Sequence, residues 1–156
     1  NQTDVGAALV ALGDVDGDGH VDVACGEPGY SGGSPGSGRI RLLRSNQSGS
    51  AAQIWSNGSF ATSAGAGRSL GNAGDLDGDG VDDLLTPVDF GVVRLLSGAT
   101  GTLLASIVDG DVDSTNPVAG IGDQNGDGVP EFAVGKPAYS SQRGRVTVYD
   151  GATRTV

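Results

Sequence analysis

Three short segments of this 156-residue chain place oxygen-bearing side chains at a fixed spacing. They cover residues 13–22, 74–83 and 122–131, and we call them loops 1, 2 and 3. Counted from the first aspartate of each loop, a carboxylate or amide stands at positions 1, 3, 5 and 9, and a glycine stands at position 6. Hard divalent cations take about six to eight oxygen ligands, which alternate side chains of a tight loop can supply. The spacing therefore predicts one cation site in each loop.

Each predicted site combines four side chains with the backbone carbonyl of position 7, because glycine at position 6 permits the sharp turn that brings this carbonyl to the ion. Ligand sets made only of oxygen favour Ca²⁺ over Zn²⁺ or Cu²⁺, and Mg²⁺ is a weaker candidate because it keeps several waters. We expect about three Ca²⁺ ions, one per loop. The predicted ligands are Asp14, Asp16, Asp18, His20 and Asp22 in loop 1, Asp75, Asp77, Asp79, Val81 and Asp83 in loop 2, and Asp123, Asn125, Asp127, Val129 and Glu131 in loop 3.

Acidic turns also occur without a metal, because Asp and Gly favour turns for backbone reasons alone. Two features favour the metal: the same register recurs three times, and more than half of the 19 acidic residues crowd into the loops. Such crowding is repulsive unless a cation neutralises it. The loops are not EF-hands, which need a glutamate at position 12; here Cys25, Thr86 and Val134 stand there. We expect loop 3 to bind most weakly, since Asn125 replaces a carboxylate.

The loops lie within a repeated series of short strands. A segment of small residues precedes each loop, at 6–12, 67–73 and 118–121. An alternating apolar segment follows each loop, at 21–25, 81–85 and 129–134, and after a Gly/Pro turn comes another, at 38–43, 91–96 and 144–149. One more strand is predicted at 52–55 and at 103–108, whereas the chain stops at Val156 before its third counterpart. No segment has a sustained helical period, so no helix is predicted.

Four short antiparallel strands in about 40–60 residues are typical of a β-propeller blade. We therefore predict an all-β fold, a single β-propeller segment over residues 1–156 with repeats at about 5–60, 65–110 and 117–156. Propellers close with about 4–8 blades, so three form a partial propeller. Blades elsewhere in a longer parent, or identical chains, would complete the ring. The chain contains no Met and is interpreted as a mature or excised segment. A β-sandwich of the same strands is the alternative.

The order of these elements resembles the FG-GAP repeat of integrin α-subunit propellers and of many secreted bacterial and fungal proteins. The shared features are the loop Gly-Asp-x-Asp-Gly-Asp-Gly-x-x-Asp and the Gly-x-Pro elements Gly26-Glu27-Pro28 and Gly135-Lys136-Pro137. The second repeat departs with Thr86-Pro87, and Val5-Gly6 and Ala66-Gly67 stand where the family has Phe-Gly. The resemblance implies one Ca²⁺ per loop, bound between the first two strands of a blade. Members are mostly extracellular adhesion, ligand-binding or scaffold modules, and several are lectins.

Composition excludes several other functions. The net charge of −10, with only nine Lys and Arg, argues against nucleic acid as a partner. No apolar run approaches the length of a membrane span. One His, one Lys and one Cys offer no evident acid–base pair, so no enzyme is expected; a lyase or hydrolase carried on the propeller is the weaker alternative.

We expect a Ca²⁺-stabilised extracellular or secreted module, with the cell surface as one location, that serves as a binding or adhesion scaffold for a protein or glycan ligand. One alternative is a lectin, which only Trp55 and the tyrosines support as sugar-stacking residues. A single Trp in a strand is, however, more often a partly buried core residue. Another is a fragment with no ligand of its own that self-assembles into a homo-oligomer. Arg39, Arg41 and Arg44 are expected to pair with neighbouring carboxylates, and Cys25 is expected to be buried.

Overall fold

The structure, a computed structural model, describes residues 3–32, 34–45 and 52–156. Its strands form three antiparallel sheets in which neighbours in the chain are neighbours in the sheet. The first sheet contains β1 (Leu9–Ala11), β2 (Val23–Glu27), β3 (Arg39–Arg44) and β4 (Ala52–Asn57). The second contains β5 (Gly71–Gly74), β6 (Asp83–Val88), β7 (Val92–Leu96) and β8 (Leu103–Val108). The third contains β9 (Val118–Gly122), β10 (Glu131–Lys136) and β11 (Arg145–Tyr149).

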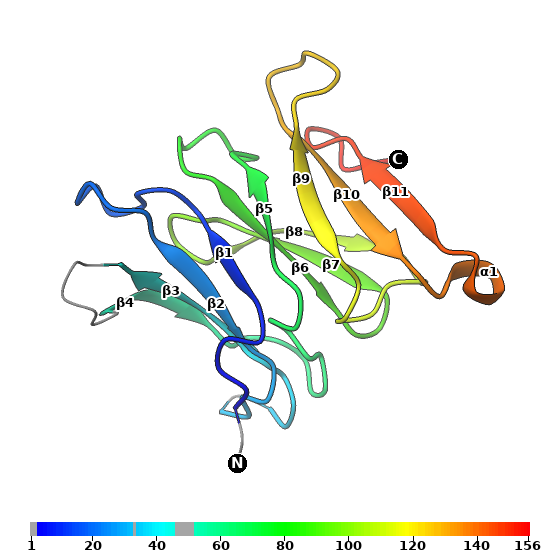
Figure 1. Ribbon diagram of the computed structural model, residues 1–156, viewed down its shortest axis with the longest axis horizontal. Coiled ribbons are helices and arrows are strands. Elements are labelled where there is room, and N and C mark those ends of the chain that lie inside the picture. Colours follow the sequence, from blue (N-terminus) through cyan, green and yellow to red (C-terminus); the bar gives the residue numbers. More distant parts are fainter. Residues whose placement is uncertain (1–2, 33, 46–51) are drawn as a thin grey trace.

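The three sheets follow one another as blades of a partial propeller, which confirms the predicted all-β fold (Figure 1). Their first strands lie side by side, with β5 between β1 and β9 and in contact with both. Each acidic loop joins the first strand of a sheet to the second. All three loops therefore lie at the same end of the sheets, the upper edge in Figure 1.

The hydrophobic core lies between the sheets rather than inside one layer. Leu42 of β3 belongs to a buried cluster with Leu84 and Leu96 of the second sheet. The opposite face of the second sheet buries Leu85, Val93 and Leu95 in a cluster with residues of the third sheet, where the rings of Phe132 and Tyr149 stack 5.4 Å apart. The second sheet is thus apolar on both faces, as expected of an inner blade and not of one layer in a two-layer β-sandwich.

The strand after each loop begins two residues later than predicted, at 23, 83 and 131 instead of 21, 81 and 129. In loop 1 the reason is local, because the backbone N–H of Asp22 donates to the Gly13 carbonyl at 2.7 Å and the intervening residues close the loop. The same strands also end later. The Gly26-Glu27 and Gly135-Lys136 pairs, predicted as turn residues, continue β2 and β10.

The prediction of no helix is wrong by one turn. A four-residue helical turn, α1 (Tyr139–Gln142), connects β10 to β11. Two of its residues, Ser140 and Ser141, have left-handed backbone angles with φ of 49° and 59°, so it is not a regular helix. The N–H of Gly144 closes the turn by donating to the Tyr139 carbonyl. This closure needs no apolar periodicity, so sequence periodicity does not reveal it.

Candidate metal sites

Each acidic loop brings three carboxylates together. Oxygens from the three members of each group all lie within 4.8 Å of one another. The groups are Asp14, Asp16 and Asp18 in loop 1, Asp75, Asp77 and Asp83 in loop 2, and Asp123, Asp127 and Glu131 in loop 3. Nine of the predicted ligands are therefore brought together, three at a time.

Hydrogen bonds within each loop hold these side chains in place. The carboxylate at position 1 accepts the backbone N–H of the glycine at position 6, at 2.8 Å from Gly19 to Asp14 and from Gly80 to Asp75. The side chain at position 3 accepts the N–H of position 5, as in Asp79 to Asp77 at 3.1 Å. These bonds wrap the backbone around the carboxylates and so bring their oxygens together.

Glycines at positions 4 and 6 allow this wrapping, because both have left-handed backbone angles in every loop. In loop 2, φ is 80° at Gly78 and 88° at Gly80. Residues with a Cβ rarely adopt such angles. A Cβ added at either position of loop 2 would meet no atom within 4 Å, so packing does not require glycine there. The backbone angles do.

The carboxylate at position 9 is buried in every loop and accepts a backbone N–H from the loop itself. Asp22, Asp83 and Glu131 each accept the N–H of position 2, at 3.0 Å from Val15, 2.8 Å from Leu76 and 2.5 Å from Gln124. Asp22 and Asp83 also accept an N–H from the residues that follow the third strand of the sheet, at 3.3 Å from Ser45 and 2.9 Å from Gly98. Position 9 therefore connects the loop to the sheet.

Six predicted ligands lie outside the three groups. The carboxylates of Asp22 and Asp79 do not join the other acidic side chains of their loops. In loop 3, Asn125 places its side-chain nitrogen 3.0 Å from Glu131 and 3.1 Å from Asp127. The remaining three, His20, Val81 and Val129, stand at position 7, where the predicted ligand is the backbone carbonyl. The backbone N–H of each of these residues donates to the position-5 carboxylate of its loop.

The loops differ in electrostatic environment. Burial, together with the negative charges of Asp77 and Asp79, raises the pKa of Asp83 to about 6 despite its two backbone hydrogen bonds. In loop 3, the N–H groups of Gly128 and Gly126 hold the pKa of Asp123 below its usual value. Without a cation, the buried carboxylate of loop 2 is therefore protonated mainly below about pH 6.

Two charged residues outside the loops contact them. Arg44 pairs with Asp16, and its Nε lies 3.8 Å from Asp18. Its pairing with a carboxylate was predicted, as was that of Arg39 and Arg41, which both pair with the buried Glu27. Asp150, which lies 3.1 Å from the side-chain nitrogen of Asn125, was not predicted as a loop residue. Its sequence signal is the turn pair Asp150-Gly151, directly after the predicted strand 144–149.

The ligand sets fit Ca²⁺. Every atom in the three groups is a carboxylate oxygen. Ca²⁺ lies about 2.3–2.6 Å from each ligand oxygen, so two oxygens on opposite sides of the ion are separated by about 4.6–5.2 Å. Mutual distances within 4.8 Å meet that requirement. Zn²⁺ sites favour histidine and cysteine, and the three groups contain neither residue.

Trp55 lies between two sheets. Its indole N–H donates to the Gly98 carbonyl at 2.7 Å, and the ring packs against the core between the first and second sheets. The prediction that it is partly buried is confirmed. Cys25 is buried as predicted. Among the described residues, no helix is long and apolar enough to cross a membrane.

Comparison with known proteins agrees with the sequence resemblance. Residues 14–86 match the family described as FG-GAP-like repeat. The match covers loops 1 and 2 and the strands from β2 into β6. A search of curated proteins found no match.

Proposed function

Because residues 14–86 place this chain in the FG-GAP-like repeat family, we propose that it is a Ca²⁺-stabilised propeller module that works outside the cell as a binding or adhesion scaffold without catalytic activity. The observation that carries the proposal is the threefold grouping of carboxylate oxygens within 4.8 Å at one end of the sheets. Asp14, Asp75 and Asp123 would each begin one ligand set.

Calcium would act on stability because each loop confines several negative charges. An ion that binds the folded loop and not the unfolded chain stabilises the fold by mass action. The loop also holds the start of the second strand through position 9, so neutralising it strengthens a connection to the sheet. A rigid set of sheets is what a binding scaffold requires.

Thermal unfolding with and without Ca²⁺ tests this proposal. We expect the melting temperature to rise by many degrees in millimolar Ca²⁺ relative to excess EDTA, and to rise less in equimolar Mg²⁺. Calorimetric titration should give about three ions per chain, and the Asp75→Ala variant should bind one fewer. Identical melts in Ca²⁺ and EDTA would contradict the proposal.

The ligand of the scaffold is a protein or a glycan, and the structure weakens one argument for a lectin. Trp55, the main sugar-stacking candidate, contacts the second sheet through its ring and its indole N–H. A glycan array is the direct test, and binding that survives the Trp55→Phe substitution would point to a site elsewhere on the surface.

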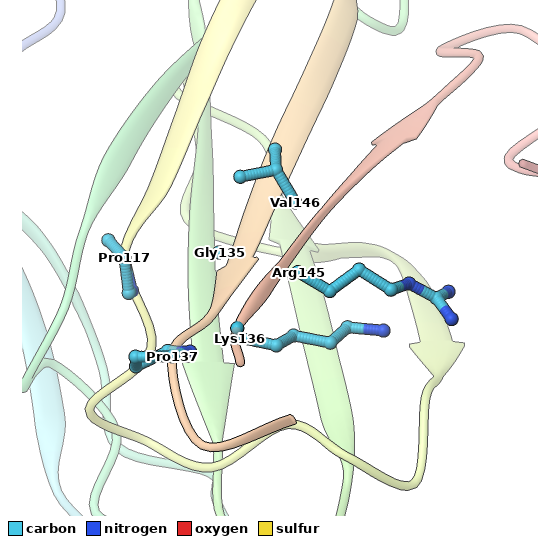
Figure 2. Close-up of a pocket in the computed structure, with 7 residues that line it drawn as sticks. Pro117, Gly135, Lys136, Pro137, Arg145 and Val146 are labelled. Carbon is cyan, nitrogen blue, oxygen red and sulfur yellow. The ribbon is translucent and has the colours of Figure 1, made fainter. Parts of the chain in front are cut away.

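Self-association is a second candidate function, favoured by the outer face of the third sheet. Val146 and Val148 of β11 are 69% and 46% exposed. The equivalent residues of the other sheets, Ile40 and Leu42 in β3 and Val93 and Leu95 in β7, are fully buried. The same face also carries an apolar hollow lined by Pro117, Gly135 and Val146 among others (Figure 2).

We propose that a sheet from a second copy of this chain covers that face. Within the chain, the equivalent positions of β3 are buried against the second sheet, and those of β7 are buried against the third. We expect sedimentation velocity to show association that strengthens with concentration, and the Val148→Asp variant to remain monomeric. Val108→Asp is the matched control, since Val108 is 80% exposed on β8 and lies outside this face. A wild-type chain that is monomeric at every concentration would contradict self-association.

A further inference from the structure

One position at the loop-facing end of the third strand differs in charge among the three sheets. The strand register identifies this position. In each sheet, the residue directly after position 9 pairs with a residue of the third strand: Val23 with Leu43, Leu84 with Leu96, and Phe132 with Tyr149. The next residue in the chain is therefore equivalent in all three sheets. It is Arg44 in the first sheet, Ser97 in the second and Asp150 in the third.

In the first sheet this position supplies a positive charge to loop 1. The guanidinium of Arg44 pairs with Asp16, and its Nε lies 3.8 Å from Asp18. Both partners belong to the oxygen group of that loop. Arginine stays protonated at any ordinary pH, so loop 1 holds a permanent cation of its own where Ca²⁺ would bind.

In the third sheet the same position supplies a negative charge. A carboxylate oxygen of Asp150 lies 3.1 Å from the side-chain nitrogen of Asn125, which also lies 3.0 Å from Glu131. Asp150 thus brings a carboxylate to the place where loop 3 has an amide. The second sheet has the neutral Ser97, beside a loop whose positions 1, 3, 5 and 9 are all aspartate.

We propose that Arg44 is a built-in competitor for Ca²⁺, and that loop 1 is the weakest of the three sites. The inference rests on the proposed calcium binding and concerns how the Ca²⁺ affinity differs among the three loops. The positive charge of Arg44 beside Asp16 and Asp18 repels a cation at that group, whereas Asp150 offsets the missing carboxylate of Asn125. The order expected from the loop residues alone, with loop 3 weakest, is thereby reversed.

Titration of the metal-free chain with Ca²⁺ in the presence of a chromophoric chelator resolves the sites. The wild type should bind two ions tightly and one about tenfold more weakly. Arg44→Ser, which installs the residue of the second sheet, should strengthen the weak step about tenfold and leave the other two unchanged. Asp14→Ala should remove the weak step, which assigns it to loop 1.

Arg68→Ser is the matched control, because it removes the same charge from an exposed residue beside Gly67, which lies against Gly26 near the end of β2 that is remote from loop 1. Asp150→Ser should weaken one of the two tight steps. The proposal is overturned if Arg44→Ser binds like the wild type or like Arg68→Ser, or if Asp14→Ala removes a tight step. Three equal sites in the wild type would defeat this inference alone, whereas no Ca²⁺ binding at all would defeat the proposed function with it.

Discussion

The buried carboxylate of Asp83 accepts a 2.9 Å hydrogen bond from the backbone N–H of Gly98, fifteen residues further along the chain. This bond fastens loop 2 to the turn between β7 and β8. The fit is close, because a Cβ added at Gly98 would lie 1.9 Å from the carbonyl oxygen of Asp82. Loop 2 is therefore part of the sheet's own framework, and its charge state bears on the stability of the whole second sheet.

The first prediction concerns the pH dependence of the metal-free protein. The folded state raises the pKa of Asp83 from 3.8 to about 6. Since the folded chain then binds more protons than the unfolded chain, this contribution to stability is complete below pH 3.8 and is lost as pH rises through 6. In EDTA we expect the melting temperature to rise between pH 7.5 and pH 5.5. In Ca²⁺ it should fall over the same range, because protons compete with the ion.

Asp83→Asn tests the assignment of that slope. The variant should be less stable, since an amide cannot accept both backbone hydrogen bonds as the carboxylate does, and its melts in EDTA should depend less on pH. Asp111→Asn, at an exposed aspartate, is the control and should keep the wild-type slope. An unchanged slope in Asp83→Asn would show that another group titrates.

The second prediction concerns an ion pair that joins the second sheet to the third. Asp109 directly follows β8 and pairs with Lys136 of β10, whose side chain is only 1% exposed. Asp109→Asn leaves this lysine buried without its partner, and breaking a buried pair in this way costs about 3–5 kcal/mol. Urea denaturation at pH 7 should show a loss of this order, and Asp111→Asn should stay near the wild type.

The same carboxylate gives the opposite pH dependence from Asp83. Burial tends to raise the pKa of Asp109, but hydrogen bonds from Lys136 and Tyr149 and the charge of Lys136 hold it below its usual value. Its contribution is therefore present above pH 3.8 and is lost as pH falls below that value. We expect acid unfolding below pH 3.8 to be steeper in the wild type than in Asp109→Asn; equal steepness would contradict this origin.

The acidic loops and the order of strands could be predicted because their signals are local. Position 3 accepts the N–H of position 5, as in Asp79 to Asp77, so the aspartate–glycine spacing largely specifies the loop. The strand limits could not be predicted as well. Val21 looks like the start of an apolar strand, yet the Asp22 N–H is still bonded to Gly13, and this keeps Val21 in the loop.

The charged contacts between distant segments could not be predicted in full. That Arg39 would find a carboxylate was predicted, but its partner Glu27 looked like a turn residue in the sequence. Asp109 and Lys136 meet only because the second and third sheets pack together. Asp150 approaches Asn125 for a similar reason, since the third strand of the sheet ends beside the loop. Such pairs depend on how the sheets are placed, and a single sequence does not show that placement.

The third prediction concerns the indole of Trp55. Trp55→Phe keeps a large apolar ring between the first and second sheets but removes the 2.7 Å hydrogen bond to Gly98. A hydrogen bond of this kind contributes about 1 kcal/mol, and part of the ring's packing is lost as well. Urea denaturation should show a decrease of at least that size. Tyr139→Phe, in α1, is the control, and a Trp55→Phe variant as stable as this control would contradict the role of the indole.

The fourth prediction separates the backbone requirement of loop 2 from its packing. Gly80 has φ of 88°, and a Cβ added there meets nothing within 4 Å. Gly80→Ala should therefore cost about 1–2 kcal/mol through backbone strain alone. It should also weaken Ca²⁺ binding, because the Val81 carbonyl, a predicted ligand, directly follows this turn. Gly110→Ala is the matched control, since its Cβ also meets nothing and its φ is not left-handed. Gly80→Asn should recover part of the loss, because Asn tolerates the left-handed region better than Ala. Equal Ca²⁺ affinity in Gly80→Ala and the wild type would show that binding does not need this turn.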